Sequence, residues 1–307
     1  MNEEKQLQLL ERLRRPEGRV DVVLDTDTYN EIDDQFALAY LIKSADKLNL
    51  KAIYAAPFFN EKSEGPADGM EKSFQEIHHI LSLMGKEEEY GKVVYRGSTS
   101  YLLSETEPVR SDASEHLAGL AMQYTPDKPL YVVALGAITN VASAILMQPE
   151  IVDRIVLIWL GGNSYEWPDN YEFNLMQDVA AGRVVFGCGA AMVQLPCMGV
   201  VSAFTTCAGE LEMFLRGRNR LCDYLVDLAE IEGAAGSKNR CWSRAIWDVT
   251  AVGWLLDESF MQDRLAPSPI PQYDHHYSFD PRRHLIRYVY HIERDNLFED
   301  LFRKLAE

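Results

Sequence analysis

Two kinds of block alternate over the first two thirds of this chain. Short apolar runs rich in β-branched residues predict buried strands, and they occur at 20–24, 50–57, 93–95, 130–135, 155–160 and 191–195. Apolar residues at helical spacing predict helices between these runs, at 2–15, 33–44, 70–84, 111–124, up to 147, and at 179–187. Strands alternating with helices indicate an α/β fold, with a mainly parallel central sheet flanked by helices.

The pattern changes after residue 202. Residues 202–257 are mostly helical in spacing, whereas Tyr277 and the apolar run 287–292 predict a terminal hairpin, followed by a short helix. No internal repeat, low-complexity tract or linker interrupts the chain. We therefore expect a single domain over 1–307 with a helical C-terminal elaboration.

Composition excludes several classes of function. A hydrophobic content of 47% in 307 residues is ordinary for a globular protein, and the net charge of −17 argues against a nucleic-acid-binding surface, which needs a basic face. No apolar run reaches the ~20 residues of a membrane helix, and residues 1–15 lack a signal-peptide core. An odd number of cysteines without Cys-x-x-Cys spacing predicts reduced thiols, no zinc site and a cytoplasmic location: Cys188, Cys197, Cys207, Cys222 and Cys241.

The densest group of carboxylates lies between the first strand and the helix after it. The strand leads into Asp25-Thr26-Asp27, the helix begins with Asp33-Asp34, and Glu31 lies between them. Carboxylates this close repel one another unless protons or a cation offset the charge, and oxygen ligands suit calcium or magnesium. Helix capping would explain Asp33 and Asp34. It would not explain Asp25 and Asp27, so we favour a metal site.

Other predicted strands also end in polar residues or glycines. In a parallel sheet these ends meet at one edge, which is where ligands bind. The sequence therefore predicts a functional site built from residues that are far apart in the chain: Asp25, Asp27, Asn60, Gly136, Asn140 and 161–163.

Four segments, in order, resemble the nucleoside hydrolases. The acidic loop resembles their Asp-x-Asp…Asp-Asp signature, and residues 135–142 resemble their Gly-x-Leu-Thr-Asn-Ile-Ala segment. Residues 160–163 with Glu172-Phe173-Asn174 resemble the Gly-Gly…Glu-Phe-Asn segment, and 247–252 resemble the late aspartate segment. The matches span about residues 20–260, and four motifs in order are more specific than any one of them.

The resemblance implies calcium-dependent hydrolysis of the N-glycosidic bond of ribonucleosides to free base and ribose, by a homodimer or homotetramer. It implies a Ca²⁺ site made by Asp27, Asp34, Asp248 and the carbonyl of Leu135, with Asp27 also acting as the general base. It implies ribose contacts from Asp33, Asn60, Glu172 and Asn174, with either Asn163 or Asn170 as a further contact. Asp25 would be a supporting group.

The chemistry agrees with these residue types. Breaking an N-glycosidic bond develops positive charge on the ribose, which carboxylates and amide oxygens stabilise. A cation makes water a better nucleophile near neutral pH, and a neighbouring carboxylate takes its proton. In the adjacent pair, Asp34 can bind metal while Asp33 turns to the sugar.

Two features depart from the family pattern. Five residues, rather than three, separate Asp27 from Asp33; we expect this longer loop either to bring Asn30 or Glu31 into the pocket or to disturb the metal geometry. Trp247 stands where many members have a histidine that protonates the leaving base. An aromatic residue there resembles the purine-preferring branch, in which it stacks on the base, although a core role for Trp247 is the alternative.

Two other functions compete with this interpretation. Asp25-Thr26-Asp27 resembles the start of the nucleophile loop of magnesium-dependent haloacid dehalogenase-type phosphatases, but Tyr29 does not fit that loop. A non-catalytic riboside-binding protein would account for the longer loop and the missing histidine. The predicted site does not include the two histidine pairs, at 78–79 and 275–276. The second pair lies in a late loop that could overhang the pocket.

Overall fold

An eight-stranded sheet forms the centre of the computed structural model, which describes residues 3–236 and 242–307. The strand order is β3-β2-β1-β4-β5-β6-β12-β9, and every neighbouring pair is parallel except β12 with β9. The fold is therefore α/β with a mainly parallel sheet, as predicted. The strands are β1 (Val20–Thr26), β2 (Leu48–Ala55), β3 (Val94–Arg96), β4 (Leu130–Ala134), β5 (Ile155–Leu160), β6 (Ala191–Leu195), β9 (Met261–Pro267) and β12 (Leu285–Ile292).

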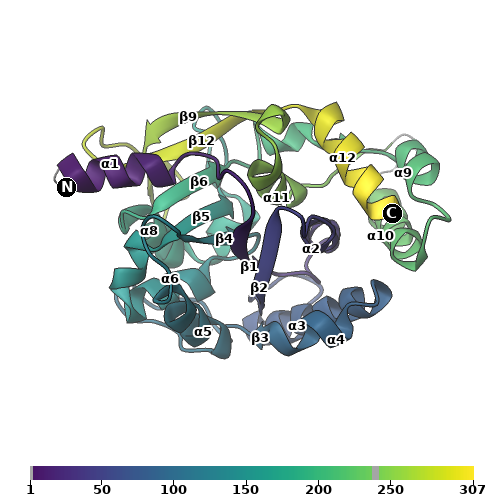
Figure 1. The fold of residues 1–307 in the computed structure, drawn as a ribbon, viewed down its shortest axis with the longest axis horizontal. Coiled ribbons are helices and arrows are strands. Elements are labelled where there is room, and N and C mark those ends of the chain that lie inside the picture. The colour runs from purple at the N-terminus through teal and green to yellow at the C-terminus, as the bar shows by residue number, and fades with distance from the viewer. Residues whose placement is uncertain (1–2, 237–241) are drawn as a thin grey trace.

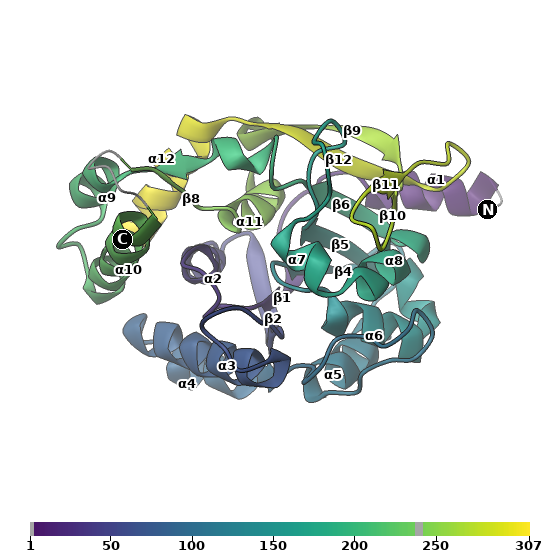
Figure 2. The same ribbon diagram turned by 180° about the vertical axis from the view of Figure 1, so that it is seen from behind.

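Helices cover both faces of this sheet (Figures 1 and 2). Val22 and Leu24 belong to a core shared with α2, α3, α11 and α12, whereas Val23 belongs to a second core with α5, α6 and α8. Successive side chains of a strand point to opposite faces, so a strand buried on both sides has an unbroken apolar run. The helices are α1 (Glu3–Arg12), α2 (Asp33–Lys43), α3 (Pro66–Leu83), α4 (Glu87–Tyr90), α5 (Asp112–Ala121), α6 (Thr139–Met147), α7 (Phe173–Gln177), α8 (Val179–Gly187), α9 (Ala208–Phe214), α10 (Arg220–Gly236), α11 (Val249–Leu256) and α12 (Arg294–Ala306).

The predicted terminal hairpin is wrong. Its second strand, β12, joins the central sheet, parallel to β6 and antiparallel to β9. Tyr277 instead lies in β11 (Tyr277–Ser278), which pairs with β10 (Ile270–Pro271) in a separate small hairpin. β9 was missed because Gln262, Asp263 and Arg264 are consecutive polar residues, which an edge strand tolerates and a buried strand does not.

The helical part of the C-terminal region is α9 to α11, with α12 at the end, and a short pair of strands, β7 (Thr205–Thr206) and β8 (Arg244–Ala245), interrupts it. Cys188, Cys197, Cys207 and Cys222 are free thiols, as expected, whereas Cys241 lies outside the described residues. Within the described ranges, every helix is too short or too polar to cross a bilayer.

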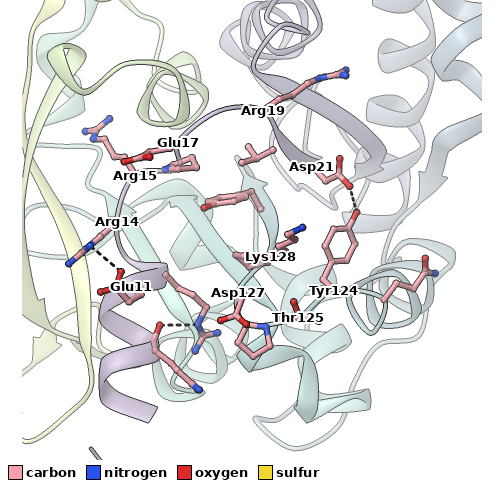
Figure 3. A pocket seen from close by; sticks show the side chains of 18 of the residues that line it. Glu11, Arg14, Arg15, Glu17, Arg19, Asp21, Tyr124, Thr125, Asp127 and Lys128 are labelled. Carbon is pink, nitrogen blue, oxygen red and sulfur yellow. Dashed lines mark hydrogen bonds and ion pairs between the residues drawn. The ribbon is translucent and has the colours of Figure 1, made fainter. Parts of the chain in front are cut away.

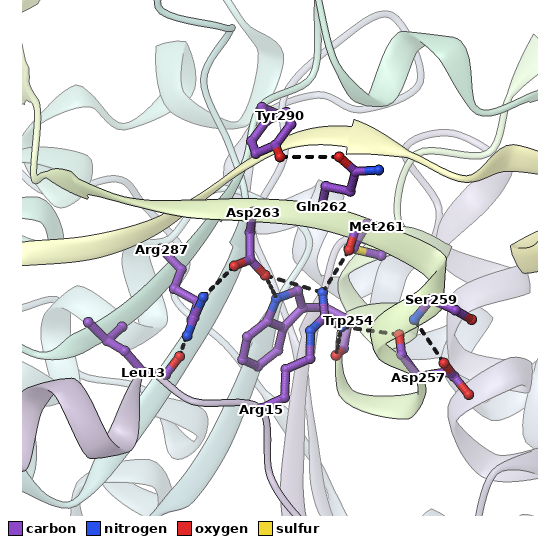
Figure 4. Close-up of polar contacts among 10 residues, drawn as sticks. All are labelled: Leu13, Arg15, Trp254, Asp257, Ser259, Met261, Gln262, Asp263, Arg287 and Tyr290. Atoms are coloured by element: carbon purple, nitrogen blue, oxygen red, sulfur yellow. Dashed lines mark hydrogen bonds and ion pairs between the residues drawn. The ribbon is translucent and has the colours of Figure 1, made fainter.

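A buried ion network fastens the segment after α1 to the sheet edge (Figure 4). Asp263 accepts hydrogen bonds from Arg15 Nη2 at 3.2 Å, Arg287 Nη1 at 2.5 Å and Trp254 Nε1 at 2.9 Å. Its side chain is 7% exposed. Because Trp254 lies on α11, which begins directly after Asp248, the network also fixes the helix that carries this predicted site residue.

A groove lies at the amino ends of the parallel strands (Figure 3). It has a volume of about 1030 Å³ and lies between the segment before β1 and the turn before β4. Its charged groups partly satisfy one another: Arg14 pairs with Glu11 at 3.1 Å, and Tyr124 donates to Asp21 at 2.8 Å. The predicted site residues belong to the opposite edge.

Candidate active site

A smaller cavity, of about 190 Å³, opens at the carboxyl edge of the sheet. Asp27, Leu135, Leu160 and Cys197 line it, and each lies at or just beyond the end of one of four adjacent strands, β1, β4, β5 and β6. Nine of the ten predicted site residues line this cavity, and Asn60 is the exception. The fold therefore brings together residues that are more than two hundred positions apart, as the convergence of strand ends predicted.

Four buried carboxylates form one wall. Oxygens of Asp33, Asp34 and Asp248 lie within 4.8 Å of one another, and Asp34 also contacts Asp27. Burial, and then the neighbouring carboxylates, raise the pKa values of Asp27 and Asp248 well above the ordinary range, and burial is the main cause of the rise of the Asp34 pKa to about 6. The fully charged cluster is therefore unfavourable unless a cation offsets the repulsion.

The atoms around the cluster fit a hard divalent cation. Oδ2 of Asp27 is buried without a hydrogen-bond partner. The Leu135 carbonyl accepts one hydrogen bond, from Asn174 Nδ2 at 2.6 Å, which leaves a second lone pair for a ligand. A Cβ at Gly136 would lie 2.9 Å from Cγ of Asp27, so the glycine makes room for this carboxylate. The Asp27 carboxylate and the Leu135 carbonyl both offer oxygen atoms, which are the donors that calcium and magnesium prefer.

Asp33 and Asp34 do not act as simple helix caps. The residue before α2, Ile32, makes no side-chain capping bond, and both aspartates are nearly inaccessible in the first turn of the helix. Oδ2 of Asp33 accepts from the backbone N–H of Asp248 at 3.3 Å, and Oδ1 of Asp34 accepts from Thr26. These contacts join β1, α2 and the start of α11 around one point.

A second group of cavity-lining residues lies at the N-terminus of α7. Glu172 caps this helix: Oε1 accepts from the N–H of Asn174 at 2.9 Å, and Oε2 accepts from Leu175 at 2.9 Å and Gly162 at 2.8 Å. Burial still raises its pKa against these bonds. Asn174 donates through Nδ2 to the carbonyls of Leu135 and Leu160, so its Oδ1 is the amide atom that is available to a ligand.

The structure distinguishes the two asparagines that the sequence left open. Asn163 lines the cavity and Asn170 does not; both are nearly inaccessible, and Asn170 Oδ1 accepts from the N–H of Asn163 at 2.7 Å. Asp25 is likewise buried behind the acidic wall, where Asn140 Nδ2 donates to it at 2.8 Å; burial raises the pKa of Asp25 to about 7. Asn170 and Asp25 are placed to support neighbours.

The longer loop after Asp27 brings both Asn30 and Glu31 to the cavity. Asn60 donates through Nδ2 to Asn30 Oδ1 at 2.7 Å, so it reaches the cavity only through that neighbour. Glu31 pairs with Arg244 at 2.5 Å, which ties the loop to the segment leading to Trp247. Sequence reasoning did not identify Arg244, because nothing in the local pattern marks a contact over this separation.

For Trp247 the sequence left two roles open, stacking on the base or packing in the core. Trp247 is half-buried against the core and it also lines the cavity. Further lining residues that the sequence did not identify are Tyr171, Phe173, Cys197 and Met198. The Cys197 thiol stays protonated, because burial and then the adjacent Glu172 raise its pKa well above the ordinary value.

Fold and cavity together define an α/β protein with an acidic, oxygen-lined ligand site at the carboxyl edge of its sheet. Residues 22–280 match the family described as inosine-uridine preferring nucleoside hydrolase, and the chain belongs to this family. A 72-residue stretch is 36% identical to the pyrimidine-specific ribonucleoside hydrolase RihB of Escherichia coli O1:K1 / APEC, covering 22% of this chain and 23% of the relative. The chain matches only 23–30% of the length of such curated relatives.

Solved structures agree over almost the whole chain. The plant nucleoside hydrolase PpNRh1 has a TM-score of 0.74 at 17% identity, over 94% of this chain and 99% of that one. The purine-preferring ribonucleoside hydrolase from Gardnerella vaginalis has a TM-score of 0.69 at 17% identity, over 93% and 98%. At these identities the likeness shows the fold alone.

Proposed function

We propose that this chain is an N-ribohydrolase, which uses water to cleave ribonucleosides into free base and ribose. The observation that carries the proposal is the unpartnered, buried Oδ2 of Asp27 inside a cluster of carboxylates, in the same cavity as Glu172 and Asn174. One cavity thus holds an acceptor for a proton and oxygen groups for a sugar, which are the two needs of N-glycosidic hydrolysis.

We propose Ca²⁺ as the metal, held by Asp27, Asp34, Asp248 and the Leu135 carbonyl. Bound there, a divalent cation lowers the pKa of water in the cavity. Asp27 takes the proton of the attacking water through Oδ2, the atom that has no other partner. The cation also offsets the repulsion that raises the pKa values of these aspartates.

The remaining lining residues position the substrate. Oxygen atoms of four lining residues accept hydrogen bonds from the ribose hydroxyls and stabilise the positive charge that develops on the sugar: Asp33, Asn163, Glu172 and Asn174. Asn60 acts through Asn30, which it orients. Trp247 stacks on the leaving base, and its large flat ring supports a preference for purines.

The two competing functions differ in what they require of Asp25 and Asp27. A phosphatase of the haloacid dehalogenase type needs Asp25 as an exposed nucleophile, but this side chain is fully buried, is bonded to Asn140 and does not line the cavity. A riboside-binding protein would use the same cavity without turnover, so only an activity measurement separates it from an enzyme.

The test is a panel of purine and pyrimidine ribosides, assayed for reducing sugar with calcium and with a chelator. We expect ribose release that the chelator abolishes and added calcium restores. Asp27→Asn should lower turnover by about 10²- to 10⁴-fold, the usual contribution of a general base, and should still bind ribose. Asp127→Asn, on an exposed turn outside the cavity, is the matched control. Phosphate release, or turnover unaffected by chelation, would contradict the proposal.

Assembly follows the family resemblance and location follows the cysteine pattern, and both are further proposals. We propose that residues 1–307 work as one domain in a cytoplasmic homodimer or homotetramer. A single sheet that takes strands from residue 20 to residue 292 supports the one-domain arrangement. Sedimentation analysis of the purified chain measures the oligomer directly.

A further inference from the structure

Tyr171 is an aromatic side chain left largely in solvent at the mouth of the cavity. It lines the cavity, yet 62% of it is exposed. It directly precedes Glu172, and its backbone N–H donates to Asp169 Oδ1 at 2.9 Å. Trp247 lines the same cavity from the segment before α11, so two separate loops each supply one aromatic ring.

The turn between β10 and β11 holds the Tyr171 ring in place. The ring of His275 meets it edge-on, with centroids 4.7 Å apart and an interplanar angle of 84°. The carbonyl of His275 also accepts from the N–H of Asn170 at 2.6 Å. His275 therefore contacts the backbone of Asn170 and the ring of Tyr171, which are consecutive residues of the loop.

His275 adopts an uncommon backbone conformation to make these contacts. Its φ is +60°, and among the described residues it is the one non-glycine with a positive φ. Side chains other than glycine enter this region at a cost, although histidine and asparagine do so more often than most. The strain is thus located at the residue that touches Asn170 and Tyr171.

The base of the hairpin is anchored just as closely. The hydroxyl of Tyr277 accepts from Gln194 Nε2 at 2.9 Å and contacts the Asn170 side chain. A Cβ at Gly162, where φ is +75°, would lie 1.9 Å from this hydroxyl. The loop that carries Asn163 and Tyr171 therefore packs against the hairpin at both its tip and its base.

We propose that Tyr171 is a second base-contacting residue and that His275 is the positioning residue that holds its ring at the cavity mouth. The inference rests on the proposed riboside hydrolysis. The ligand is the flat aromatic base of a ribonucleoside, which covers the exposed Tyr171 ring while Trp247 contacts the base from the segment before α11. Covering an exposed aromatic face with a second ring is favourable through both burial and ring geometry.

The proposal predicts that base binding and sugar binding separate. In the full chain with calcium, Tyr171→Ala should raise KM for inosine about 3- to 10-fold, with a smaller change in kcat. The dissociation constant of free ribose, measured by calorimetry, should not change, because ribose lacks the base. Tyr171→Phe should restore the wild-type KM, because the ring is retained.

His275 is tested with variants that tolerate its backbone conformation. His275→Asn keeps a residue suited to positive φ but removes the ring, and it should raise KM for inosine in the same direction as Tyr171→Ala. His275→Gly also tolerates this conformation and lacks the ring, so it should raise KM for inosine in the same direction. His276→Ala is the control, because this exposed neighbour contacts its own turn rather than Tyr171. Thermal unfolding of each variant checks that it folds.

Two results would overturn the inference while the proposed function stands. One is a wild-type chain that hydrolyses inosine with a KM that Tyr171→Ala does not alter. The other is an equal weakening of ribose and inosine by Tyr171→Ala, which would mean general damage to the loop. A wild-type chain that neither binds nor hydrolyses any riboside would overturn the proposed function, and the inference with it.

Discussion

Replacing Asp34 by asparagine should stabilise the metal-free protein and at the same time abolish its stabilisation by calcium. Asp34 is 1% exposed and lies against Asp27 and Asp248. Its folded-state pKa of about 6, against 3.8 for the unconstrained group, means that ionised Asp34 opposes folding by about 3 kcal/mol above pH 6, at about 1.36 kcal/mol per unit. Asparagine has nearly the same shape and removes this charge.

Calcium should bring the two proteins to nearly the same stability. A ligand that binds only the folded state adds about 2.7 kcal/mol at a free concentration about 100-fold above its Kd. Wild type should gain this stability, whereas Asp34→Asn, which has lost a charged ligand, should gain little. The assay is urea unfolding at about pH 8, for both proteins, in chelator and in excess calcium.

A buried aspartate outside the cluster supplies the control. Both oxygens of Asp178 accept hydrogen bonds, from Leu102 N and Ala181 N at 2.9 Å and from Thr139 Oγ1 at 2.7 Å. Asp178→Asn should therefore destabilise the protein in chelator, the opposite sign to Asp34→Asn, because an amide nitrogen cannot accept these bonds. An Asp34→Asn protein that is less stable than wild type in chelator, or that gains as much from calcium, would refute the reasoning.

Three further predictions follow from particular contacts. Asp263→Ala should lower the free energy of unfolding by about 3–5 kcal/mol, because it leaves Arg15 and Arg287 without their buried partner; a loss below about 1 kcal/mol in urea unfolding would argue against the network. In chelator, the contributions of Asp25 and Asp34 should make the protein more stable as the pH falls from about 8 to 5, because their folded pKa values, about 7 and about 6, exceed the unfolded value of 3.8; a urea midpoint that decreases over this range would show the opposite linkage. Trp247→Ala should raise KM for purine ribosides more than for pyrimidine ribosides, by about 3- to 10-fold, with Trp247→Phe close to wild type; equal effects on both classes would favour a purely structural role.

Much of the sheet could be predicted from the sequence because its strands are buried on both faces. The runs that became β4 and β5 are continuously apolar, and those that became β1 and β6 are mostly so, so their identity did not depend on tertiary context. β9 could not be predicted in this way, because it is an edge strand whose buried and exposed residues alternate irregularly. α7 is only five residues long, too short for helical periodicity to reveal it, and its start is set by the Glu172 cap.

The same division applies to the site. The acidic loop and the segments before α6 and α7 carry local signatures, so most of their cavity-lining residues were identified from the sequence, although Tyr171 was not. Asp248 could be joined to Asp33 only through the family pattern, since the contact spans 215 residues. The contact of Arg244 with Glu31 and that of His275 with Tyr171 depend on how loops pack, for which no periodic signal exists. Asn60, predicted as a ribose contact, does not line the cavity but bonds to Asn30, which does; the longer loop that supplies Asn30 could not be built from the sequence.

The most direct test of the central claim is a calcium titration of the metal-stripped chain, with binding heat and ribose release from inosine followed in the same samples. The carboxylates of Asp27, Asp34 and Asp248 should take up one ion per chain, and ribose release should rise from zero in proportion to occupancy. Full turnover by the stripped protein, or heat-free titration with no activity at saturating calcium, would contradict the account.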